Sequence, residues 1–272
     1  QLYALEKRGT YAKKEKLVAF IDIGATNSWA SVYKFVPAKR RPTAIQLSLA
    51  TRHNFGGQNI DLKLANLLLS AYREKYYAGK SDDEFSRICP SSLHARFVEE
   101  ARKAKEQLTI NKEVEIRMDD IEDDKSLSYT VTRDTFNSLI SDFKDELLSL
   151  YKEAVDKADI SIKNLDSTEL IGSVTRIPLL KDALINACSE NKIDRTMNSE
   201  EAIVLGAGYV GATRSSAFIV KDVDMKSFAN INVSFIHNNT VIPIFNESSY
   251  LDETFKYSFS IGDVCNVSDV HE

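Results

Sequence analysis

Apolar residues recur along most of this chain with one of two periods, and the two periods alternate. Runs of β-branched and aromatic residues predict strands at 17–21, 29–33, 45–50, 114–118, 127–131 and 168–171. Apolar residues at every third or fourth position predict helices at 61–77, 93–108, 132–158, 179–191 and 200–213. The first two strands form a predicted β-hairpin, and a short strand or turn is expected at 194–197. This alternation predicts an α/β fold.

Several features of these elements depend on single residues. Asp61 is the expected N-cap of the helix at 61–77, and Thr132 that of one uninterrupted helix ending near Ala158. Residues 79–90 are expected to form a loop. The predicted buried stripe of the 61–77 helix consists of Leu62, Ala65, Leu69 and Tyr72.

Two segments of small residues follow predicted strands in the first quarter of the chain. Asp22–Ser28 is the tip of the hairpin, where backbone N–H groups can hold a phosphate and Asp22 is placed for Mg²⁺ or its waters. In Phe55–Asp61 the pair Gly56-Gly57 lets backbone approach a ligand. A plain hairpin and a tight turn are the alternatives for these segments.

Two further segments lie near residues 170 and 200. Thr168–Pro178 runs from a short apolar strand through Gly172-Ser173 and Thr175-Arg176 into a proline that opens a helix, so its backbone N–H groups are free to meet an anion or a flat ligand. Asn198–Gly208 is a capped helix whose small residues allow close packing. Alone, either segment is also compatible with a purely structural turn or helix.

In order and spacing, the four segments resemble the second half of the actin-like ATPase domain of the seventy-kilodalton heat-shock chaperones. That family has Asp-Leu-Gly-Gly-Gly-Thr at the first site, Gly-Gly-Glu-Asp-Phe-Asp at the second, Gly-Gly-Ser-Thr-Arg-Ile-Pro at the third and Asn-Pro-Asp-Glu-Ala at the fourth. The resemblance covers about residues 1–213 and implies the second lobe (lobe II) of that domain. It implies ATP or ADP with Mg²⁺ as cofactors.

The resemblance also implies roles for individual residues. Asp22 and Asn27 take the positions closest to the reacting phosphate, and Asp22 would hold Mg²⁺ through water. The residues that take the family's nucleotide-binding positions are Gly24, Ala25, Thr26, Gly56, Gly57, Lys105, Thr109, Gly172, Ser173, Arg176 and Glu200.

Several positions depart from the family pattern. The glycine triplet is reduced to Gly24-Ala25-Thr26, the next Thr is Asn27, and an Asp is replaced by Trp29. In the helix that holds adenosine, Arg102 and Glu106 invert the family's charges, and a glutamate cannot stack on adenine as a guanidinium does. Adenine is therefore expected to be held by Arg176 on one side only. This drift resembles the large, divergent chaperones of the superfamily, which act mainly as nucleotide-exchange factors and holdases.

Beyond Thr213 the pattern changes to short strands with polar turns. Strands are expected at 217–223, 229–236, 240–245 and 255–261. They resemble the opening strands of the family's β-sandwich substrate domain, although the family's linker is replaced here. The sequence therefore predicts two parts, a nucleotide-binding lobe at 1–213 and a linker with an incomplete β-sandwich at 214–272.

Composition limits the remaining possibilities. The chain of 272 residues is 43% hydrophobic, enough for a real core, and its net charge of −5 argues against a nucleic-acid surface. No apolar run approaches the length of a membrane span, and the first residues form no signal peptide. Because Gln1 is not Met, a processed product or a fragment is expected. Cys89, Cys188 and Cys265 are far apart and are expected to be free thiols.

Four N-glycosylation sequons, beginning at Asn232, Asn238, Asn246 and Asn266, crowd the last 41 residues. Such crowding favours exposure to the secretory pathway. Together with the divergent motifs, it resembles the large member of the family in the lumen of the endoplasmic reticulum. That resemblance implies a nucleotide-exchange factor for the lumenal chaperone BiP and a holdase for unfolded client polypeptides.

Other functions remain open from the sequence. An ordinary ATP-hydrolysing chaperone would share these motifs, and an interaction module that has lost nucleotide binding would share the fold. A sugar-kinase-like phosphotransferase needs a catalytic Asp between its lobes, which the sequence does not locate. The chain by itself holds only half of a cleft, so it is expected to bind ATP weakly and not to hydrolyse it, and weak turnover is expected of the full-length protein.

Overall fold

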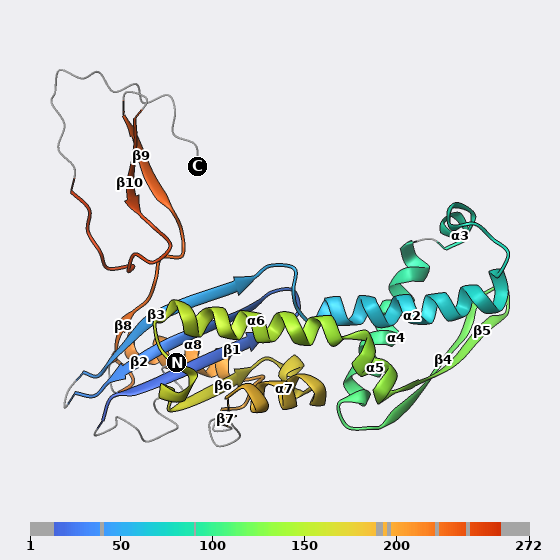
Figure 1. Cartoon of the computed structure of the whole chain (residues 1–272), viewed down its shortest axis with the longest axis horizontal. Helices are drawn as coiled ribbons and strands as arrows, with labels where there is room; N and C mark the ends of the chain where they lie inside the picture. The colour runs from blue at the N-terminus through green and yellow to red at the C-terminus, as the bar shows by residue number, and fades with distance from the viewer. Residues whose placement is uncertain are drawn as a thin grey trace.

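Up to β8 (Asp224–Lys226), a six-stranded sheet forms one half of the chain and a helical unit with a long β-hairpin forms the other, while a second hairpin near the C-terminus stands apart (Figure 1). This computed structural model describes residues 14–38, 41–89, 91–188, 193–194, 197–220, 223–237 and 240–256. The α/β fold predicted from the sequence is confirmed.

The sheet has the strand order β7-β6-β1-β2-β3-β8. Its strands are β1 (Lys16–Ile23), β2 (Ser28–Val36), β3 (Thr43–Arg52), β6 (Ser167–Ile171), β7 (Ile193–Asp194) and β8 (Asp224–Lys226). β2 runs antiparallel to both β1 and β3, whereas β6 runs parallel to β1. β1 therefore lies at the centre, where the predicted hairpin meets the strand that precedes Gly172.

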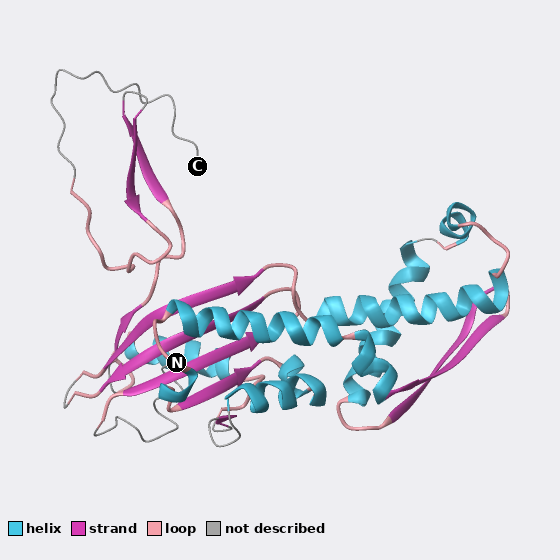
Figure 2. Ribbon diagram, viewed as in Figure 1, coloured by secondary structure: helices cyan, strands magenta, loops and turns pink. Residues whose placement is uncertain are grey.

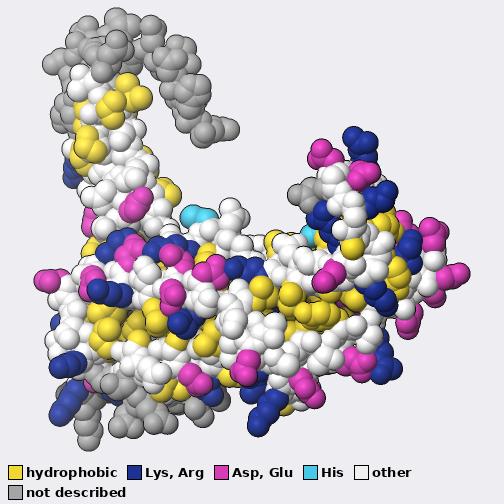
Figure 3. Space-filling model, turned by 45° about the vertical axis from the view of Figure 1, so that its right-hand side comes forward, with side chains coloured by type: hydrophobic (Ala, Val, Ile, Leu, Met, Phe, Trp, Pro, Cys, Tyr) yellow, Lys and Arg dark blue, Asp and Glu magenta, His cyan; other side chains and the backbone are white. Residues whose placement is uncertain are grey.

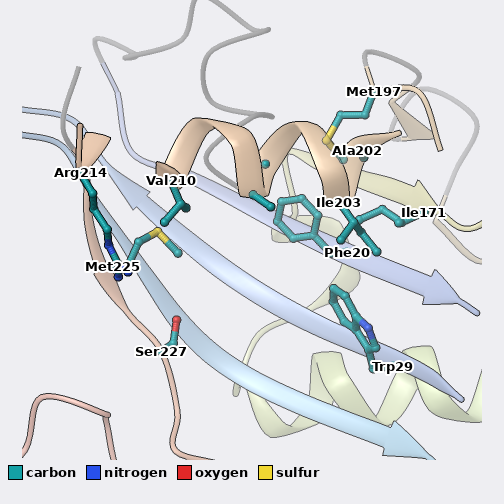
Figure 4. Close-up of a pocket in the computed structure, with 12 residues that line it drawn as sticks. Phe20, Trp29, Ile171, Met197, Ala202, Ile203, Val210, Arg214, Met225 and Ser227 are labelled. Carbon is teal, nitrogen blue, oxygen red and sulfur yellow. The ribbon is translucent and has the colours of Figure 1, made fainter. Parts of the chain in front are cut away.

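The two faces of the sheet are covered by different helices because successive side chains of β1 point to opposite sides. Ala19, Ile21 and Ile23 belong to the larger core, which they share with α6 (Ser141–Lys157) and α7 (Pro178–Cys188). Val18 and Phe20 belong to a smaller core under α8 (Ala202–Thr213). Figure 1 shows α6 and α7 on one face of the sheet, and Figure 4 shows α8 on the face that carries Phe20.

The second half of the molecule is built around two long helices that pack on each other (Figure 2). They are α2 (Gly57–Tyr77) and α4 (Ser91–Leu108), with α3 (Asp82–Ile88) between them in the chain. The hairpin of β4 (Glu113–Glu122) and β5 (Lys125–Thr132) lies against them, and α5 (Arg133–Leu139) leads back to α6. α2 begins where the tip of the β1–β2 hairpin meets it, so this junction connects the two halves.

Several helix boundaries differ from the prediction. The expected loop at 79–90 contains α3, which Ser81 and Glu84 cap reciprocally: the Ser81 hydroxyl accepts from Glu84 N–H, and the Glu84 carboxylate accepts from Ser81 N–H. The expected single helix from Thr132 is broken at Ile140, although Thr132 does cap its start. α2 begins at Gly57, four residues before Asp61, and Leu62 of its predicted stripe is exposed.

The described residues of the C-terminal part form strands that differ from the prediction. β8 pairs with β3 and so extends the six-stranded sheet, while residues 217–220 and 223 form no strand. β9 (Val233–His237) and β10 (Thr240–Phe245) form a separate hairpin that carries exposed apolar side chains (Figure 3). The expected strand at 255–261 lies mostly outside the described residues. The boundary at residue 213 stays a prediction, and β8 lies beyond it.

Candidate functional site

The tip of the β1–β2 hairpin and the first turn of α2 are joined by backbone hydrogen bonds. Gly57 N–H donates to the Gly24 carbonyl at 2.9 Å, and Gln58 N–H donates to the Ala25 carbonyl at 2.8 Å. The Ser28 hydroxyl donates to the Phe55 carbonyl at 2.6 Å. The first N–H groups of α2, which a helix leaves without internal partners, are therefore satisfied by the hairpin tip.

This close contact requires glycine at position 56 and leaves little room for a side chain at position 57. A Cβ on Gly56 would lie 2.6 Å from the Ala25 carbonyl, and a Cβ on Gly57 would lie 3.0 Å from Val174 Cγ2. The Cβ added at Gly57 would also lie 3.4 Å from the Lys105 ammonium nitrogen. Hairpin, helix and the turn after β6 thus approach one another at Gly57.

The hairpin tip itself has the character of an anion site. Ala25, Thr26 and Asn27 are exposed, and within the described part of the chain no hydrogen bond engages their backbone N–H groups. Three successive free N–H groups in a tight turn form a concavity that suits a phosphate oxygen. The Asn27 side chain points elsewhere, because its Oδ1 accepts from Asn54 N–H at 3.2 Å.

The turn at Gly172 brings the third and fourth segments to the end of β1. Gly172 has φ +85°, and a Cβ there would lie 2.2 Å from the Ile23 carbonyl oxygen, so only glycine fits. Its N–H donates to the Ser199 carbonyl at 2.9 Å. The Arg176 guanidinium pairs with the Glu200 carboxylate at 2.9 Å, and both side chains are half exposed. Ser173 is exposed beside them.

Lys105 reaches the same junction from α4. Its ammonium lies 2.7 Å from Asp61 Oδ1, and the two side chains are only 13% and 6% exposed. Burial raises the pKa of the Asp61 carboxyl, an effect that the neighbouring Lys105 ammonium opposes. The prediction of Asp61 as an N-cap is wrong, and the residue instead forms a buried ion pair with a predicted nucleotide-binding lysine.

The inverted charges on α4 pair with each other. Arg102 lies 2.9 Å from Glu106 and 2.8 Å from Glu99, all on the exposed face of the helix. The Thr109 hydroxyl donates to the Glu106 carbonyl at 2.7 Å. Ion pairs between exposed residues three or four apart stabilise a helix only slightly.

Asp22 is a poor fit to Mg²⁺. The carboxylate is 6% exposed, and its burial raises its pKa, an effect that the facing Trp29 indole opposes. Mg²⁺ retains several waters and needs negatively charged oxygen atoms that those waters can reach. Among the described residues, no group of three or more His, Cys, Asp or Glu side chains is arranged to hold a metal.

The structure therefore brings most predicted site residues to one place. Gly24, Gly57, Lys105 and Gly172 converge at the end of β1, and Arg176 and Glu200 lie at the next turn. Thr109 directly follows α4, four residues beyond Lys105, and its hydroxyl donates to the carbonyl of Glu106 in that helix. Sequence reasoning missed two pairings here, the ion pair of Asp61 with Lys105 and the position of Trp29 opposite Asp22 on the hairpin.

This lobe has the sheet, the covering helices and the glycine-rich turns of the actin-like ATPase class. The family model described as "Hsp70 protein" matches residues 2–255, and the chain belongs to this family. Members of the Hsp70 ATPase family bind nucleotide, typically with Mg²⁺.

Curated relatives are similar at low identity. The chain is 25% identical to "Hypoxia up-regulated protein 1" of Danio rerio over 80% of its own length, and 25% identical to a heat shock protein homolog of Naumovozyma castellii over 82%. It is also 25% identical to "Heat shock protein hsp88" of Neurospora crassa over 89%. It spans 22%, 31% and 34% of these relatives' lengths. Within the described residues, no helix is both long and apolar enough to span a bilayer.

Proposed function

We propose that this chain is the second nucleotide-binding lobe of a large Hsp70-type chaperone that binds ATP or ADP and acts mainly as a nucleotide-exchange factor. The hairpin tip and the turn after β6 would hold the phosphates, and Arg176 with Ser173 would face the adenine. Lys105, held by its ion pair with Asp61, would lie next to the Gly57 backbone and help to position the start of α2. Hydrolysis would be weak, and binding would set the conformation of the protein.

The uneven state of the site carries this proposal. Groups suited to holding a nucleotide are in place, namely the free N–H groups of 25–27 and the glycines packed at 57 and 172. The positions near the reacting phosphate differ from the family pattern. The Asn27 side chain accepts a hydrogen bond from Asn54 N–H, and Trp29 replaces the acidic residue of the family. A ligand that favours one conformation can shift it without being cleaved, since only its differential affinity matters.

The compartment and partners follow from the sequons and from the resemblance to the large lumenal member. Asn232 and Asn246 are exposed beside the β9–β10 hairpin, where a glycosyltransferase can reach them. The proposed location is the lumen of the endoplasmic reticulum. The proposed partners are the nucleotide-binding domain of BiP and unfolded client polypeptides, the clients on which Hsp70-family members act.

Calorimetric titration of the full-length protein with ADP and ATP, paired with a turnover assay, tests the proposal. Micromolar binding with turnover far below that of an ordinary chaperone ATPase is the expected result. Ordinary turnover would assign the alternative of an active chaperone ATPase, and absence of binding would assign an interaction module that has lost its ligand.

A further inference from the structure

Asp22 and Trp29 stand directly opposite each other on the antiparallel strands β1 and β2. Side chains in such a pair lie on the same face of the sheet. The Trp29 indole therefore lies beside the Asp22 carboxylate, close enough to oppose the rise of its pKa, and takes part of the space that metal-bound waters would need there. On the other side the backbone of Gly172 passes close to Asp22, since a Cβ added to this glycine would lie 3.1 Å from the Asp22 Oδ1.

The surroundings of this pair are apolar. Trp29 lines a cavity of about 440 Å³ between α8 and the sheet, together with Phe20, Ile171 and Met197 (Figure 4). Phe20 precedes Asp22 by two residues and lies on the same face of β1, in the core under α8. Asp22 therefore follows the apolar side chains of Val18 and Phe20 on this face of β1. The residue opposite it on β2 is Trp29, where the family has a second carboxylate.

We infer that the Trp29 indole occupies the place of the metal's hydration shell at Asp22, so that this site holds nucleotide without requiring Mg²⁺. The inference rests on the proposed nucleotide binding and goes beyond it, because it concerns the species bound. A phosphate would be held by backbone N–H groups, and its charge would not be shared with a cation at Asp22. Neither Asp22 nor Trp29 would contact a metal.

The test is calorimetric titration of ADP into the full-length protein, once with Mg²⁺ and once with a chelator. The wild-type dissociation constant should differ by less than about twofold between the two conditions. Trp29→Asp restores two facing carboxylates, and should make the affinity at least about tenfold dependent on Mg²⁺. Trp29→Phe keeps the aromatic ring but removes the N–H, so a smaller Mg²⁺ dependence is expected. Thermal melts establish that each variant is folded.

A wild-type protein whose affinity falls about tenfold or more with the chelator overturns the inference. So does Mg²⁺ independence of both folded variants, because the indole would then not be what excludes the metal. If the wild type binds no nucleotide in either condition, the proposed function fails and the inference fails with it. Binding that depends strongly on Mg²⁺ overturns the inference alone, so the two failures are distinguishable.

Discussion

The ammonium of Lys105 is held inside the structure by the carboxylate of Asp61, next to the Gly57 backbone. Removing one member of a buried ion pair leaves the other charge without compensation. The pair therefore matters to the fold in its own right, apart from any contact of Lys105 with a nucleotide. Lys103 on the same helix pairs with Glu100 at the surface and provides a matched comparison.

Lys105→Met is expected to lower the free energy of unfolding at neutral pH by about 3–5 kcal/mol, because Asp61 is left buried and unpaired. Lys103→Met should lower it by less than about 1 kcal/mol. The double variant Asp61→Asn with Lys105→Met should recover part of the loss. Urea denaturation of the three variants measures this, and equal losses for both lysines would show that the buried pair contributes nothing special.

The same pair predicts a pH dependence. Since burial raises the folded-state pKa of Asp61 above its ordinary value of 3.8, the folded chain keeps a proton that the unfolded chain has released. The contribution of Asp61 to stability therefore falls as the pH rises from the ordinary value through the raised pKa, and is constant above it. Lys105→Met removes the charge that opposes this rise, so the Asp61 pKa should rise further and the stability should fall over a wider pH range than in the wild type. A parallel pH profile would contradict the account.

At the scale of elements, the start of α2 is set by a partner distant in the chain. Gly24 and Ala25 accept the N–H groups of Gly57 and Gln58, and the Asn59 side chain accepts from Gly56 N–H at 2.8 Å. The helix therefore begins at the glycine pair although glycine has no capping side chain. This junction also fixes the hairpin tip relative to the helical unit.

Asn59→Ala should lower the free energy of unfolding by about 1 kcal/mol, since it removes the side-chain acceptor for Gly56 N–H. Asn59→Asp keeps that acceptor and should retain most of the stability. Gln58→Ala, at an exposed position of the same turn, is the control and should be nearly neutral. Equal effects of the alanine changes at 58 and 59, measured by denaturant unfolding, would show that the cap is not what starts α2.

The strands and the order of elements could be predicted because their signals are local. The hairpin at 17–36 and the strand at 240–245 follow from runs of apolar and β-branched residues. The start of α2 could not be predicted from the sequence, because the carbonyls that accept from its first N–H groups lie some thirty residues earlier in the chain. The break at Ile140 has no proline or glycine to signal it, whereas the Ser81…Glu84 capping pattern did mark α3.

The candidate site was predictable as a set of segments but not as a set of contacts. Spacing and resemblance selected the glycines at 24, 57 and 172, which the fold places together. The partner of Lys105 depends on how α2 and α4 pack, which periodicity does not specify. The contact of Trp29 with Asp22 was within reach, because a short hairpin loop sets which residues face each other.

At the scale of the whole molecule, α8 is apolar around its whole circumference, yet much of it faces solvent. Ile203 and Val204 are 60% and 65% exposed, and only Ala202 and Tyr209 are buried. A helix that is apolar all round is normally covered. The chain spans about a fifth to a third of the relatives' lengths, and the proposed facing lobe would supply such a cover.

The proposed lumenal location predicts glycans on the β9–β10 region. Asn232 and Asn246 are exposed, while Asn238 and Asn266 lie outside the described residues. Protein purified from the host should lose mass when an amidase strips its N-glycans, and Asn246→Gln together with Asn232→Gln should reduce that loss. Removal of all four sequons provides the control. If amidase treatment causes no mass loss in the wild-type protein, lumenal exposure of this segment is refuted.

The central claim is that nucleotide binding, more than hydrolysis, drives exchange on a partner chaperone. Stopped-flow release of labelled ADP from BiP by the full-length protein tests it most directly. Gly57→Ala narrows the junction beside Val174 and should abolish the acceleration, while Asn27→Ala should leave it nearly intact. Gly172→Ala is unsuitable because its Cβ would collide with the Ile23 carbonyl and disturb the fold. Normal exchange by a folded Gly57→Ala protein, with failure of Asn27→Ala, would contradict the account.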